Sequence, residues 1–175
     1  MTIKLKKALF DVARDIQEEA DQTFLPPQDI VPTRRNDVLV YSVFENTRGY
    51  LKKIVFQINK SYSVNCYDAC AVMIRRLLEV LIVETFDAKG LINKTQDASG
   101  AVLKLDDLIK AVINESSLTL APKTKRILES RKIKILGDLS AHGRRYNACR
   151  KDIDEIRQDL AIVVQDLLYL SGLKK

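Results

Sequence analysis

The longest apolar stretch of the sequence, residues 66–86, constrains the fold more than any other feature. It contains no proline and no glycine, and leucine, methionine, alanine and glutamate dilute its β-branched residues, so it favours an α-helix. At about 100° per residue, its charged side chains gather on one narrow stripe: Asp68, Arg75, Arg76 and Glu79. The rest of the circumference is apolar, so we expect this helix in the core, surrounded by other helices.

The same stripe argues against a membrane span, because a span needs about 20 apolar residues and these charges lie in the middle of the run. We interpret Arg75, Arg76 and Glu79 as a solvated, ion-paired stripe, with phosphate binding as the alternative. Glu84 falls on the apolar face, which indicates a position near the helix end rather than a catalytic role.

Length and composition are typical of one globular domain. The 175 residues are 46% hydrophobic, with six glycines, four prolines and no low-complexity tract. Three cysteines, an odd number, fit reduced thiols, and the N-terminus lacks the apolar segment of a secretory signal, so a cytoplasmic location is expected. We divide the chain into an N-terminal helix and proline-containing connector, residues 1–45, and a helical bundle, residues 46–175.

Helical periodicity recurs along most of the chain. Residues 3–24 are amphipathic, and Pro26 and Pro27 end that helix. A loop, a short strand or a helical turn all fit residues 25–45. Asn46 and Thr47 are candidates to cap a helix that runs to about Lys60. Its inward-facing side chains are predicted to be Tyr50, Leu51, Ile54, Val55 and Ile58.

The second half of the chain continues this pattern. Residues 87–104 are rich in turn formers and predict a long loop with a small hairpin. Helices are predicted at residues 105–114 and 122–142, the latter with Pro122 in its first turn. The fold class is therefore all-α, an antiparallel up-and-down bundle of five or six helices.

The last helix has the clearest spacing of all. Its apolar residues alternate by three and four, and an Asp152/Glu155 pair resembles a capping box at its start. The seam consists of Ile153, Ile156, Leu160, Val163, Leu167 and Leu170. More apolar residues lie on other faces, so the helix either passes through the core or meets a second chain.

The net charge of +6 is unevenly distributed. Residues 123–151 contain ten Lys and Arg against Glu129 and Asp138, a local charge of +8, whereas 19 basic and 21 acidic residues elsewhere give −2. A local basic face indicates a polyanionic partner such as RNA, although a solvated helix face is the plainer alternative. The candidate binding residues are Arg131, Lys134, Arg144 and Arg145.

His142 is the only histidine, and Asp138 precedes it at the i,i+4 spacing that puts two side chains on one helix face. A carboxylate can orient an imidazole for proton transfer near neutral pH. If the helix continues past Gly143, then Arg131, Lys134 and Arg145 share that face. Alternatively, Gly143 ends the helix and His142 lies in its last turn.

Metal binding is not predicted. Cys66 and Cys70 share a helical face and, with Cys149 and His142, would supply four zinc ligands, but buried thiols also serve as small core residues. No glycine-rich phosphate loop or metal-binding histidine pair is present in the sequence, and no cofactor is expected.

Three segments resemble a family of uncharacterised bacterial proteins whose domain is placed among the HEPN-like (higher eukaryotes and prokaryotes nucleotide-binding) helical domains. They are TRGYLKKIVFQIN (47–59), YDACAVMIRRLLEVLIVETF (67–86) and IKILGDLSAHGRRYNA (133–148). The resemblance implies a dimeric helical bundle. Many HEPN domains are metal-independent ribonucleases of toxin and antiviral systems, with an arginine and a polar residue shortly before a histidine.

The resemblance carries over to some of these positions. His142 matches the histidine and Asp138 the polar residue, but the window for the arginine holds Ile135, Leu136 and Gly137. Lys134 lies just outside this window, and Arg144 or Arg145 would have to supply the cation from the other side. We therefore expect a HEPN-like homodimer that binds RNA or another polyanion, with a degenerate ribonuclease site at His142 and Asp138. The alternative is a non-catalytic dimerisation module that holds a protein partner.

Overall fold

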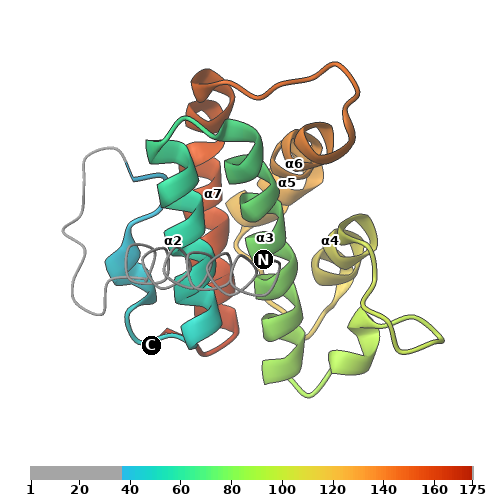
Figure 1. The fold of residues 1–175 in the computed structure, drawn as a ribbon. Helices are drawn as coiled ribbons and strands as arrows, with labels where there is room; N and C mark the ends of the chain where they lie inside the picture. The colour runs from blue at the N-terminus through green and yellow to red at the C-terminus, as the bar shows by residue number, and fades with distance from the viewer. Residues whose placement is uncertain (1–36, 175) are drawn as a thin grey trace, which may run out of the picture. The chain divides into compact units, whose positions relative to one another are not determined.

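The computed structural model describes residues 37–174, which belong to one compact unit. Helices dominate it: α2 (Gly49–Ser63), α3 (Tyr67–Ala88), α4 (Leu105–Asn114), α5 (Pro122–Ser130), α6 (Lys132–His142) and α7 (Arg150–Leu170), with 3-10 turns η1 (Tyr41–Phe44) and η2 (Ile92–Thr95) (Figure 1). This part of the chain contains no strand, only an isolated antiparallel bridge between Gln96 and Val102 in the predicted hairpin loop. The all-α prediction is confirmed, while the helix predicted at residues 3–24 lies outside the described residues.

The predicted core helix is α3, and it lies at the centre of the fold. It packs against α2, α4, α6 and α7 (Figure 1). Many of its apolar side chains are almost completely buried, among them Ile74, Leu77, Leu78, Leu81 and Ile82. Within residues 37–174 every helix is too short or too polar to span a bilayer.

Helix directions depart in part from the antiparallel expectation. A short connection joins α2 to α3, and the two helices run antiparallel (Figure 1). By contrast, α3 and α7 run in the same direction. The backbone N–H of Ala148, just before α7, donates to Asp68 in the first turn of α3 at 2.9 Å, and the Thr85 hydroxyl near the end of α3 donates to the Leu167 carbonyl at 3.4 Å.

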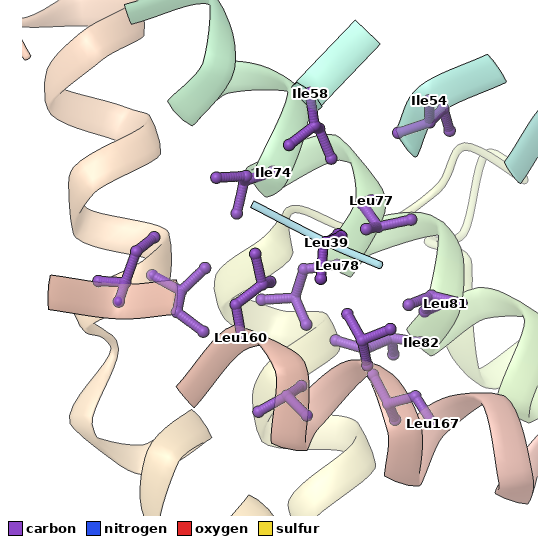
Figure 2. Packing of buried hydrophobic residues seen from close by; sticks show 14 of the residues in the cluster. Leu39, Ile54, Ile58, Ile74, Leu77, Leu78, Leu81, Ile82, Leu160 and Leu167 are labelled. Carbon is purple, nitrogen blue, oxygen red and sulfur yellow. The ribbon is translucent and has the colours of Figure 1, made fainter. Parts of the chain in front are cut away.

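The apolar seam of α7 is used inside the chain. Side chains from α2, α3 and α7 fill one continuous core, in which Leu160 and Leu167 face the α3 leucines (Figure 2). Of the two alternatives for this helix, the passage through the core is the correct one. Its capping box is formed by Cys149 and Asp152 rather than by Asp152 and Glu155, and the Cys149 N–H donates to the Asp152 carboxylate at 2.8 Å.

The single helix predicted at 122–142 is wrong, because the chain breaks at Arg131. This residue has a φ of 57°, in the left-handed region, and separates α5 from α6. Such a conformation is costly for a residue other than glycine. The break lets α5 pack on α7 while α6 packs on α3, which one straight helix cannot do.

Two details at the start of the described chain also differ from expectation. Tyr50, predicted to face inward, is 40% exposed, and Thr47 does not cap α2 because its hydroxyl donates to the Phe44 carbonyl. The segment before α2 belongs to the core, since Leu39 is buried and its backbone N–H and C=O both bond to the Asn59 side chain.

The crossing of α3 and α6 depends on Gly137. A Cβ at this position would lie 2.6 Å from Arg75 Cβ and 3.2 Å from the Ala71 carbonyl oxygen, so no other residue fits without moving one of the helices. Glycine in a helix interior normally destabilises by roughly 0.5–1 kcal/mol relative to alanine. Here that cost is offset by the close approach of the two backbones.

We predict that Gly137→Ala lowers the free energy of unfolding by about 1–3 kcal/mol, because overpacking outweighs the gain in helix propensity. Urea denaturation would measure the change. Gly49→Ala is the matched control, since a Cβ at Gly49 meets no atom within 4 Å and should leave stability unchanged or slightly higher. A Gly137→Ala protein as stable as the wild type would contradict the close approach.

Candidate functional site

A cleft of about 550 Å³ opens where α3, α6 and the start of α4 meet. Three of the six predicted site residues line it, namely Lys134, Asp138 and His142. The lining residues are Arg75, Lys104, Leu105, Asp106, Lys134, Asp138, Leu139, His142 and Gly143. Cations therefore reach one hollow from three elements that are distant in sequence.

Arg75 forms the predicted ion pair with Glu79, but it is not the solvated residue that the sequence indicated. Its side chain is only 27% exposed, because its aliphatic part packs over Gly137 of α6. Its Nε–H donates to Asp138 Oδ1 at 2.7 Å, and its Nη1 lies 2.9 Å from Glu79 Oε1. The mid-helix glycine was the available signal, since it indicates a close helix approach as well as a missing side chain.

Both carboxylate oxygens of Asp138 are engaged. Arg75 donates to Oδ1 and Lys134 Nζ donates to Oδ2. Burial opposes ionisation of Asp138, but the hydrogen bonds from Lys134 and Arg75 outweigh it and hold the pKa of Asp138 below its usual value. Within residues 37–174 no hydrogen bond joins Asp138 to His142, so the i,i+4 spacing alone does not make Asp138 an orienting group.

A second carboxylate, Asp106, pairs with Lys134 and with Arg131 beside the cleft. Arg131 Nη1 donates to Asp106 Oδ1, and Lys134 Nζ lies 3.6 Å from the same oxygen. Hydrogen bonding from Lys110 is the largest effect on the pKa of Asp106 and lowers it; burial opposes this, and the charges of Arg131, Lys110 and Lys134 add to the lowering. The left-handed break at Arg131 brings that guanidinium toward α4.

His142 is the last residue of α6 and is exposed on the rim of the cleft. The helix ends there, because the Gly143 N–H donates to the Leu139 carbonyl at 2.7 Å and the chain then turns away. A Cβ at position 143 would lie 2.4 Å from that carbonyl oxygen, so glycine is required. Of the two alternatives, the one in which Gly143 ends the helix is confirmed, and the helical face that would continue to Arg145 does not form.

The ten basic residues of 123–151 do not make one continuous face. Arg131 and Lys134 adjoin the cleft, and Arg144 and Arg145 are exposed in the turn after α6. A separate hollow of about 290 Å³ is lined by Lys123, Arg126, Ile127, Ser130, Lys132 and Asp159. The two hollows share no residue, because the break at Arg131 redirects the chain.

The other candidate residues lie elsewhere. Glu84 is in the last turns of α3, as predicted, and accepts hydrogen bonds from Tyr50 and Arg48. Burial and this contact with Glu84 raise the pKa of Tyr50 to about 12. Cys70 is buried, and that burial raises the pKa of its thiol to about 12. Within residues 37–174 no three His, Cys, Asp or Glu side chains cluster as metal ligands would.

Comparison of the chain with protein-family models, with curated proteins and with solved structures gave no match. The HEPN-like assignment therefore stays a prediction that depends on the three sequence segments quoted above.

Proposed function

We propose that this chain is a HEPN-like helical protein that binds RNA or another polyanion along the α6 side of the bundle. The observation that carries the proposal is the convergence of Arg75, Lys104 and Lys134 on one open cleft. Basic side chains from separate elements provide spaced contacts for successive phosphates, whereas a single solvated helix face does not.

The exposed turn after α6 extends this surface. Arg144 and Arg145 follow the rim residue His142 after Gly143, and neither forms an ion pair with any other residue of 37–174. Arginine is well suited to phosphate, because its planar guanidinium offers paired donors. These two residues supply sequence-independent affinity, and the cleft cations fix the register.

RNA affinity should fall steeply with salt, because each neutralised phosphate releases condensed counterion. For Arg144→Glu/Arg145→Glu we expect a salt slope of log affinity that is smaller by about 2, one for each lost contact. Fluorescence anisotropy with a labelled RNA oligonucleotide at several salt concentrations measures this. Lys52→Glu/Lys53→Glu on α2 is the control with the same charge change. Equal losses in both double variants would contradict a localised surface.

A second candidate activity, metal-independent ribonuclease, is favoured by the exposure of His142 on the rim of the cleft. His142 would transfer the proton of the attacking 2′-hydroxyl or of the leaving oxygen. Lys134, Arg144 or Arg145 would stabilise the negative charge of the phosphorane. Arg75 is a further candidate, because the arginine of the motif is absent. Because Asp138 is held by Arg75 and Lys134, this scheme uses His142 without a carboxylate partner.

We expect binding without efficient cleavage, since loss of one transition-state donor costs about 3–4 kcal/mol and Arg75 is engaged by two carboxylates. The measurement compares the wild type with His142→Ala, purified identically, on a mixed RNA pool with chelator. Equal background in both proteins is the expected result. Cleavage that is lost in the variant while RNA binding persists would establish the ribonuclease instead.

Homodimerisation forms part of the proposal, but α7 no longer supports it because its seam is buried. The better candidate surface is the outer face of α6. Ile135 and Leu139 are 49% and 41% exposed there, and with His142 they follow an i, i+4, i+7 spacing on one helix face. A symmetric contact on this face would cover both apolar side chains.

Light scattering at micromolar concentration should give about twice the monomer mass of 19.9 kDa for the wild type. Leu139→Glu should shift the mass to the monomer value, because it puts a charge into the apolar contact. Tyr169→Glu is the control, since this exposed residue lies on α7. A monomeric wild type would exclude the dimer. A dimer without RNA affinity would favour the alternative, a protein-interaction module.

A further inference from the structure

We propose that Asp138 acts as an internal competitor, with its carboxylate occupying the position between Arg75 and Lys134 that a ligand phosphate takes. The inference rests on the proposed function and adds regulation to the same site. This role is opposite to that of a residue that orients His142 for catalysis. Removing the charge of Asp138 would strengthen anion binding, whereas removing an orienting carboxylate would slow the reaction.

The geometry of the three side chains carries the proposal. Arg75 Nε–H approaches one oxygen of Asp138 at 2.7 Å, and Lys134 Nζ donates to the other. Two cations from different helices thus clamp one anion that offers two oxygens. A phosphate group presents oxygens of the same kind to the same donors, so either anion can fill this position.

The clamp lies in the cleft wall and not in the core. The side chains of Arg75, Lys134 and Asp138 are 27%, 20% and 31% exposed, and all three line the cleft. Ion pairs that solvent can reach are weak, so another anion can displace Asp138 without leaving a buried charge unpaired. Lys104 lines the same cleft and has no ion-pair partner among residues 37–174.

Glu79 keeps Arg75 in place during the exchange. Its Oε1 lies 2.9 Å from Arg75 Nη1, one turn away on α3, while the stem of Arg75 is held over Gly137. The guanidinium therefore stays at the cleft whether Asp138 or a phosphate accepts from Nε. Only the short Asp138 side chain has to rotate away.

The first test compares Asp138→Asn with Glu155→Gln for binding to a labelled single-stranded RNA oligonucleotide. Glu155 is exposed on α7 and pairs with Lys151, so its variant reports the effect of losing one negative charge. If the open state is about one-tenth populated, Asp138→Asn should raise affinity about tenfold beyond the control. A folded Asp138→Asn protein that binds no better than Glu155→Gln would overturn the proposal.

The second test uses the wild-type protein and so does not depend on a variant that folds. The Nε–H resonance of Arg75, assigned with Arg75→Lys, is followed by NMR during titration with inorganic phosphate. We expect a saturable shift, and no shift would overturn the proposal. A shift without any RNA affinity would preserve the anion site and reject RNA as the ligand. RNA binding without a shift would preserve RNA as a ligand and reject the anion site between Arg75 and Lys134.

Discussion

The close packing of α6 on α3 at Gly137 is the constraint on which the rest of the site depends. Because Gly137 lacks a Cβ, the side chain of Arg75 can cross over α6 and reach Asp138, the residue that follows Gly137. The same contact brings Arg75 of α3 close to Lys134 and Asp138 of α6 on the wall of the cleft. Gly137, which lies in the window where the resemblance expects an arginine, lets the side chain of Arg75 approach from α3.

The core determines which surfaces remain available for function. The buried apolar side chains of α3 and of the α7 seam pack against other parts of the chain, so these side chains are not available to a partner. The outer face of α6, its exposed C-terminal turn and the cleft beside it remain accessible. The proposed RNA contact and the proposed dimer contact therefore adjoin each other at Leu139 and His142, so we propose that oligomeric state and binding are coupled.

Sequence periodicity predicted the helices that are held by continuous apolar faces. Helices α3 and α7 lie where their patterns put them, because burial of those faces dominates the local energetics. Periodicity did not predict the break at Arg131, since the segment is helical on both sides and only packing on two different helices requires the turn. The apolar pattern of α2 also predicted that Tyr50 faces inward. Its hydroxyl instead donates to Glu84 at the surface.

The site was predictable only in part. Asp138, Lys134 and His142 were identified because they share one helix face, but Arg75, Lys104 and Asp106 come from other elements, and no spacing rule connects them to α6. Within α3, Glu79 is a sufficient ion-pair partner for Arg75, so the sequence pattern did not indicate a second one. Its second partner is 63 residues away in sequence.

A double-mutant cycle on Arg75→Gln and Asp138→Asn tests the central contact most directly. The free energies of unfolding of the wild type, both single variants and the double variant give the coupling between the two side chains. We predict a coupling of about 0.5–3 kcal/mol, the range for residues in direct contact. Effects that add within about 0.3–0.5 kcal/mol would show that the two helices are not joined by this ion pair, and would contradict the account.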